Sequence, residues 1–157
     1  MKRIPLNIIA AILLVVAISC NSNKQSPEAG PENLQSKADS LEKDVIEGHD
    51  VAMPKSMKIP DLQKEAKRLI DSIAKLPAKA QEATAPYKAK LEALVKDLEY
   101  ASMAMDKWMT EYSFDSARDN LEQRIKYLTE EKGKVDKVKE AVLGSIAKAD
   151  SLLKAKL

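Results

Sequence analysis

An apolar seam with steps of alternately four and three residues runs through most of this chain. It is clearest in the middle of the sequence, where eight apolar residues follow the pattern without a gap: Tyr87, Leu91, Leu94, Leu98, Ala101, Met105, Trp108 and Tyr112. A repeat of about 3.5 residues keeps these side chains on one face of a helix and is typical of helices packed side by side. The seam therefore predicts an all-α fold with coiled-coil-like packing.

The composition also favours helices over strands. Charged residues make up 32% of the chain, whereas aromatic residues make up 4% and there are four glycines. Strands favour β-branched and aromatic residues, and the turns between strands favour glycine. Pairs such as Glu92 and Lys96, four residues apart, suit exposed helix faces. We therefore expect long helices with charged outer faces.

The first arm of the seam is expected over residues 33–76, with helical pieces at 33–53 and 61–76. Pro54 and Pro60 stand between the pieces, and a proline inside a helix removes a hydrogen bond and kinks or breaks it. Whether this arm forms one kinked helix or two stays open. The alternative is a hairpin between the two prolines, which would give four helices.

Two further arms follow. Pro77 ends the first arm because the residue before a proline is pushed out of the helical conformation, while Pro86 leaves the start of the second arm open. The segment YSFDSARD ends the second arm, and its Ser116 and Asp119 form a box-like pair that would cap the third helix. Short loops make neighbouring helices antiparallel. We therefore predict an antiparallel three-helix bundle over residues 33–157, with a kinked or broken first helix.

The first twenty residues have the form of a lipoprotein export signal. Lys2 and Arg3 precede an apolar run at residues 4–18, shorter than the roughly 20 residues of a membrane-spanning helix. The run closes on the tetrad A-I-S-C, which resembles the lipobox of bacterial lipoproteins, where the signal is cut just before a cysteine that carries acyl chains such as palmitate. We expect a signal peptide at residues 1–19 and a membrane anchor at Cys20, since two or three acyl chains hold a protein stably.

A polar tether is expected between the anchor and the bundle, so that Cys20 and the tether together span residues 20–32. Two prolines, a glycine and polar residues give this stretch the composition of a flexible linker. No acidic run follows the cysteine, and in some Bacteroidota lipoproteins such a run directs export to the cell surface. The sequence thus favours the periplasmic face of the outer membrane.

The charge of the chain argues against nucleic acid as a partner. Its 26 basic and 24 acidic residues balance once Lys2 and Arg3 are removed with the signal peptide. A protein that binds nucleic acid needs a basic surface to meet the phosphates. The partners left open are an envelope protein and a second copy of the chain, because a long seam can pair with itself.

Two segments hold the candidate ligand residues: GHDVAMPKSM at residues 48–57 and SMAMDKWMTEY at residues 102–112. They contain the chain's only histidine and tryptophan and five of its six methionines. His49 and Met105 each lie 28 residues from Pro77, so an antiparallel turn there would place them at the same level.

Two ligands suit this combination of residues. Thioether sulfur with an imidazole suits Cu(I), and a His/Met pair can ligate haem between helices. The candidate ligands are His49, Met53, Met105 and Met109. The alternative interpretation is core packing, because methionine fills irregular gaps and the spacing is that of the seam. His49 would then be a partly buried histidine bonded to a backbone group or a carboxylate.

The sequence carries no enzymatic signature. It lacks a G-x-S-x-G elbow, a phosphate-binding glycine loop and an H-E-x-x-H motif, and it has one histidine. We therefore predict a binding or structural module rather than an enzyme, with no cofactor apart from the copper and haem alternatives.

Four stretches of the chain resemble a group of small Bacteroidota lipoproteins that often carry the automatic label "viral A-type inclusion protein". These stretches are HDVAMPK from His49 to Lys55, MDKWM from Met105 to Met109 with Tyr112, the segment Tyr127–Glu140, and SIAKA from Ser145 to Ala149. The resemblance implies an anchored helical domain and no established activity, ligand or partner. Pro60 departs from the family pattern, in which the first arm runs on past the first proline. A second comparison, with the murein lipoprotein that joins peptidoglycan through a terminal lysine, fails because this sequence ends in Lys156-Leu157.

Overall fold

The computed structural model describes residues 30–154, and this part of the protein is all-α, as predicted. It contains four helices with short connections: α1 (Pro31–Ser56), α2 (Ile59–Ala74), α3 (Ala78–Glu111) and α4 (Leu121–Leu153). No strand occurs between residues 30 and 154. None of the helices in this range is long and apolar enough to cross a membrane.

The start of α1 corrects one predicted boundary. The helix begins at Pro31, so residues 31 and 32, which were assigned to the tether, are helical. Proline is well placed in the first turn because its missing N–H has no partner there in any helix. The predicted signal peptide at residues 1–19 and the predicted lipidation at Cys20 lie outside the described residues.

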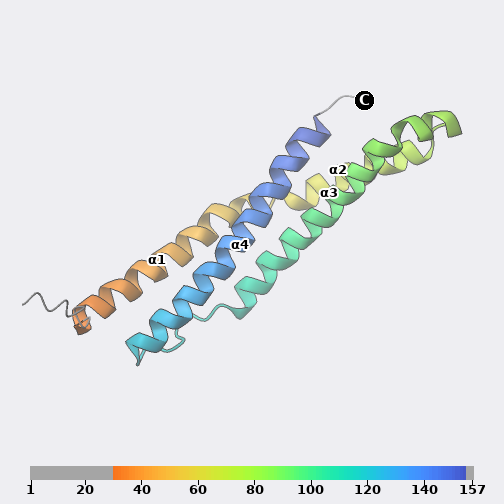
Figure 1. Ribbon diagram of the computed structural model, residues 1–157. Coiled ribbons are helices and arrows are strands. Elements are labelled where there is room, and N and C mark those ends of the chain that lie inside the picture. The colour runs from red at the N-terminus through yellow and green to blue at the C-terminus, as the bar shows by residue number, and fades with distance from the viewer. Residues whose placement is uncertain (1–29, 155–157) are drawn as a thin grey trace, which may run out of the picture.

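The helices form an elongated body in which α1 and α2 follow one another along its length (Figure 1). α3 returns beside them, and α4 then runs in the same direction as α1. α1 packs mainly on α4, α2 packs mainly on α3, and α3 also packs on α4. The connection between α2 and α3 therefore lies at the end of the molecule away from the start of α1. The alternative of a hairpin between Pro54 and Pro60 is wrong, because α2 does not fold back on α1.

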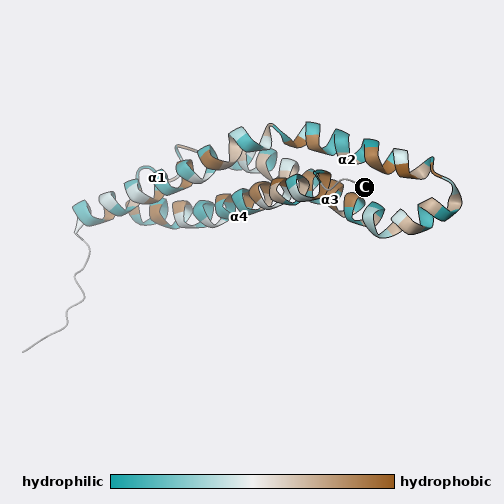
Figure 2. Ribbon diagram, turned by 90° about the horizontal axis from the view of Figure 1, so that it is seen from above, coloured by the Kyte–Doolittle hydropathy of each residue, from teal (hydrophilic) through white to brown (hydrophobic). Residues whose placement is uncertain are grey.

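One buried position recurs every seven residues along α1 and α2 without a change of phase at the break. Its members are all exposed by 3% or less: Ala38, Val45, Ala52, Ile59, Ala66 and Ile73. Hydrophobic and hydrophilic positions accordingly alternate along each helix (Figure 2). Because the seven-residue phase is kept, both helices turn the same face toward the core and the arm continues in one direction.

Pro60 accounts for the break between the two helices. It lies in the first turn of α2, where a missing N–H is tolerated. In a continuous helix the same ring would clash with the carbonyl of Ser56, four residues earlier. The chain therefore leaves the helix at Met57 and Lys58 and re-enters it at Ile59. The arm is thus two helices, while Pro54 is accommodated within the last turn of α1.

The connection between α3 and α4 differs from its prediction. α4 begins at Leu121, and the Asn120 side chain caps it by accepting a hydrogen bond from the backbone N–H of Gln123 at 3.0 Å. Ser116 is not the cap, because Ala117 has φ 57°, a left-handed conformation that ends any continuous helix through this loop. Asparagine is also among the strongest N-cap residues. At its other end, α3 starts at Ala78, directly after Pro77, so the start that Pro86 left open in the sequence is the earlier one.

α1 and α4 approach each other closely at Gly48. A β-carbon added there would lie 3.0 Å from a methyl carbon of Val135, closer than ordinary van der Waals contact. Gly133 and Gly144, both in α4, would have nothing within 4 Å of an added β-carbon. Gly48 is therefore the glycine that packing requires, whereas the two in α4 are free of such contact.

Gly48 and Gly133 give a paired stability prediction. Gly133→Ala is expected to raise the free energy of unfolding by about 0.5–1 kcal/mol, because alanine is the better helix former. Gly48→Leu is expected to lower it by about 1–3 kcal/mol, because the added side chain overpacks the contact with Val135. Urea unfolding followed by circular dichroism measures both. A Gly48→Leu variant as stable as the unsubstituted protein would contradict the close approach of α1 and α4.

Candidate functional site

The two segments singled out in the sequence meet where α1 passes α3. The ring centroids of His49 and Trp108 are 5.6 Å apart, with the rings tilted by 32°. The predicted register paired His49 with Met105, so the observed contact lies three residues further along α3, less than one helical turn. His49 is half-buried, and its Nδ1 lies 2.9 Å from the carboxylate of Asp50. This matches the packing interpretation, in which the histidine bonds to a carboxylate.

The candidate methionines lie in three different environments. Met105 is 1% exposed and belongs to the core, whereas Met109 is 37% exposed. Met53 is half-buried against the core, and its sulfur accepts a hydrogen bond from the Ser56 hydroxyl at 3.6 Å. Among residues 30–154, no group of three or more His, Cys, Asp or Glu side chains is arranged to hold a metal. Copper or haem binding at His49 stays a prediction that none of these contacts strengthens.

An aromatic stack continues from His49 toward the connection between α3 and α4. Trp108 lies in the last turn of α3 and Tyr112 directly follows the helix, and their rings stack with centroids 4.9 Å apart. Tyr112 also stacks on Tyr127 of α4 at 6.1 Å and meets Phe114 edge-on at 4.8 Å. Four of the six aromatic residues of the chain therefore gather at this level. Such ring pairs add stability beyond the area they bury.

A buried carboxylate joins the stack to α4. Glu131 is 2% exposed, and it accepts a hydrogen bond from the indole N–H of Trp108 at 3.0 Å. Its other oxygen accepts one from the Lys134 ammonium at 2.7 Å. A charge taken out of water is costly unless it is paired and hydrogen-bonded. Both oxygens of this carboxylate are satisfied, one of them by a residue of a different helix.

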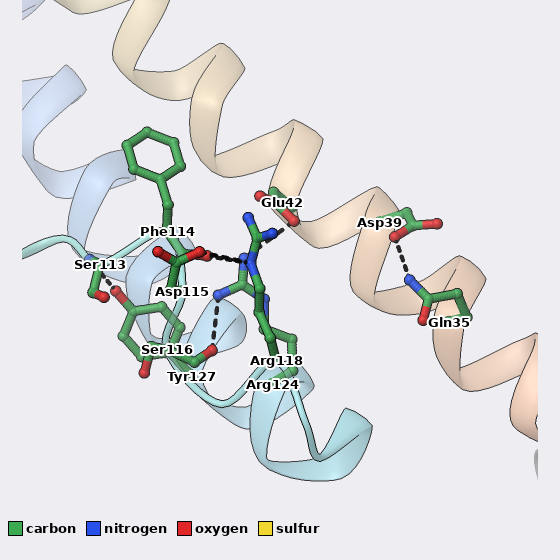
Figure 3. Close-up of polar contacts among 10 residues, drawn as sticks. All are labelled: Gln35, Asp39, Glu42, Ser113, Phe114, Asp115, Ser116, Arg118, Arg124 and Tyr127. Carbon is green, nitrogen blue, oxygen red and sulfur yellow. Dashed lines mark hydrogen bonds and ion pairs between the residues drawn. The ribbon is translucent and has the colours of Figure 1, made fainter.

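A buried guanidinium lies about two helical turns nearer the start of α4 than Glu131. Arg124 is 4% exposed, and its Nη2 lies 3.1 Å from the carboxylate of Glu42 on α1 (Figure 3). That contact is an ion pair without an aligned hydrogen bond. Arg124 also donates to the backbone carbonyl of Ser116 at 2.9 Å and lies 5.7 Å from the centre of the Tyr127 ring. The Tyr127 hydroxyl in turn accepts from the backbone N–H of Ser113 at 2.7 Å. α1, α4 and the loop before α4 are thereby tied together.

We call this set the aromatic–ionic cluster, and its members are Glu42, His49, Trp108, Tyr112, Arg124, Tyr127 and Glu131. Burial, assisted by the negative charge of Glu42, raises the pKa of Tyr112. Its phenol is therefore neutral at ordinary pH, and its oxygen has no hydrogen-bond partner among the described residues. Within the cluster the guanidinium of Arg124 pairs with Glu42, while Glu131 accepts the indole N–H of Trp108 and pairs with Lys134 beside the cluster. These contacts attach α1, α3 and α4 to one another.

The sequence analysis missed Arg124 and Glu131 as buried residues, although the pattern holds a signal for them. Along α4 one core position recurs at residues 124, 131, 138, 145 and 152, and three of these are polar. The apolar seam skips from Leu128 to Val135, and Glu131 fills the gap between them. Polar residues at core positions of packed helices set register. A missing apolar residue in a regular seam is therefore the feature that identifies such a site.

Comparison with protein-family models, with curated proteins and with solved structures found no match for this chain.

The bond between Trp108 and Glu131 can be tested by a double-mutant cycle. Trp108→Phe keeps a ring in place but removes the indole N–H, and it is expected to destabilise the protein by about 1–3 kcal/mol because a buried carboxylate loses a donor. Adding Glu131→Met removes the unsatisfied group and is expected to recover part of that loss. Urea unfolding measures each free energy. Tyr100→Phe, at an aromatic residue that is 61% exposed, serves as the control and is expected to stay within about 0.5 kcal/mol of the unsubstituted protein. A Trp108→Phe loss no larger than that of the control would refute the role of this bond.

Proposed function

We propose that this protein is a lipid-anchored helical spacer of the bacterial envelope that acts as a binding or scaffold module without catalysis. The observation that carries the proposal is the serial arrangement of α1 and α2. α1 begins at one end of the molecule, and the connection between α2 and α3 lies at the opposite end (Figure 1). The helices thus place that connection far from the proposed anchor.

The reach of the proposed spacer follows from helix geometry. α1 has 26 residues and α2 has 16. At about 1.5 Å per residue the two helices in series extend roughly 60 Å. The expected tether before Pro31 adds roughly 20 Å of flexible reach. A partner bound at the far end would therefore be held well clear of the membrane surface.

In this proposal the acyl chains on Cys20 hold the protein at the periplasmic face of the outer membrane. The helices act as a three-helix bundle whose first helix is broken into α1 and α2. The aromatic–ionic cluster supports a structural role, because Arg124 pairs with Glu42 of α1 and Glu131 accepts a hydrogen bond from Trp108 of α3, so both buried charges join α4 to another helix. Rigid attachment of α1, α3 and α4 near the anchored end is what a spacer requires.

Cys20→Ala tests the anchor. Cells that express the full chain are grown with labelled palmitate, and the membrane and soluble fractions are compared. The unsubstituted protein is expected to take up label and to fractionate with the outer membrane. The Cys20→Ala variant is expected to take up none, because it lacks the thiol that would be acylated.

Ser19→Ala provides a matched control next to the cysteine, since it keeps the thiol and a small residue before it. That variant is expected to retain the label. Uptake of palmitate by the Cys20→Ala protein, or an unsubstituted protein without label, would overturn the proposed anchor. Proteolysis of intact cells separates the two faces of the outer membrane, and a protected protein agrees with the periplasmic one.

A further inference from the structure

A row of hollows lies between α3 and α4 on the surface of the molecule, and an ion pair between Asp97 and Lys148 at 2.7 Å crosses it. The row consists of three neighbouring hollows of about 460, 180 and 480 Å³. Tyr100 lines both the first and the second, and Asp97 and Lys148 line both the second and the third. On α4 the lining extends from Lys134 to Leu152, which corresponds to roughly 27 Å, or five helical turns. We call this feature the α3/α4 groove.

Two large apolar side chains of α3 stand exposed beside the groove. Tyr100 is 61% exposed and Met103 is 64% exposed, and they lie one turn apart on the same helix face. The core residues Trp108 and Val138 form the floor next to them. Tyrosine is enriched among residues that dominate binding energy, and methionine adapts its shape to a partner. These side chains offer apolar anchors to a partner.

Small residues leave room for a helix to approach the groove. Ala93, Ala141, Gly144 and Ala147 all line it, and a β-carbon added at Gly144 would meet nothing within 4 Å. A glycine in the middle of an exposed helix weakens that helix, and no packing contact within the described residues requires this one. Helix axes that pack together lie about 8–10 Å apart, and small side chains permit the closer distances.

The end of the groove nearest Trp108 is positively charged. Lys107, Lys134 and Lys137 line it together with one acid, Glu111. Lys107 pairs with Glu111 at 3.7 Å and Lys134 pairs with the buried Glu131 at 2.7 Å, whereas Lys137 makes no ion pair within residues 30–154. A second copy of the chain would present the same lining in either orientation, and that lining holds five lysines and three acids in all. Charge therefore favours a different, acidic partner.

We propose that the α3/α4 groove binds an amphipathic helix of a partner protein. The apolar stripe of that helix lies on Tyr100 and Met103, and its acidic residues face the lysines at the Trp108 end. Helices that dock in this way use apolar anchors three or four residues apart. The inference rests on the proposed scaffold function and deepens it by naming the class of partner.

The probe is a pair of synthetic helical peptides of about 18 residues, the length of the groove. Both carry the same leucine stripe, and the flanking positions hold glutamate in one peptide and lysine in the other. Fluorescence anisotropy of the labelled peptides is measured against the full chain in nanodiscs, with empty nanodiscs as the blank. The glutamate peptide is expected to bind at least about tenfold more tightly, because its charges complement the groove.

Matched variants locate the binding site. Met103→Ala is expected to weaken binding of the glutamate peptide about fivefold, whereas Met57→Ala, at a methionine that is 72% exposed and outside the groove, leaves it unchanged. Gly144→Leu fills the groove and is expected to weaken binding more than tenfold. Lys137→Glu reduces the preference for the glutamate peptide, and Lys126→Glu, elsewhere on α4, does not.

Equal affinity for the two peptides, the absence of saturable binding, or equal effects of Met103→Ala and Met57→Ala would overturn the proposal. A chain that dimerises in sedimentation experiments, with Gly144→Leu restoring the monomer, would assign the groove to a second copy instead. If the chain takes up no palmitate, the peptides are titrated against it in buffer instead of in nanodiscs. The proposed anchor and the proposed groove can therefore fail separately.

Discussion

A buried carboxylate sets the register of this protein. Glu131 lies at a core position of α4, where the regular seam calls for an apolar side chain, and its charge is tolerated because Trp108 and Lys134 both donate hydrogen bonds to it. A slip of either helix would leave the carboxylate without its indole partner in a dry environment, which is costly. The indole is held in turn by His49 and Tyr112. One hydrogen bond thus fixes α3 against α4, and the stack around it brings α1 to the same level.

The second constraint is the constant phase of the first arm. Ala52 and Ile59 lie on either side of the break, seven residues apart, and both are fully buried. Pro60 interrupts the backbone hydrogen bonds, but the face turned to the core does not change. α2 therefore continues away from the aromatic–ionic cluster and meets α3 instead of folding back. The cluster holds α1, α3 and α4 in register at one end of the molecule, and α2 extends the arm toward the other end. The molecule is therefore elongated, and the proposed spacer role depends on this combination.

The seam from Tyr87 to Tyr112 was sufficient to predict the fold class, because periodic burial depends on local spacing. Counting residues from Pro77 predicted that His49 lies level with Met105, and its observed partner Trp108 is less than one turn away from Met105. The prediction at Ser116 was wrong because capping patterns are short, and the left-handed residue Ala117 is not visible in them. Arg124 and Glu131 were missed because a charged residue is normally placed on a solvated face. Their burial depends on partners from other helices, and such partners are known once the helices are assembled.

The serial arrangement of α1 and α2 can be measured directly by pulsed electron–electron double resonance. Spin labels attached at Glu32→Cys and Lys75→Cys, both exposed positions in the parent protein, mark the two ends of the arm in a full chain that carries Cys20→Ser. Helices in series predict a label separation of roughly 60 Å, from a rise of about 1.5 Å per residue. A separation below about 25 Å would show that α2 folds back on α1. That result would contradict the spacer and remove the basis for its reach.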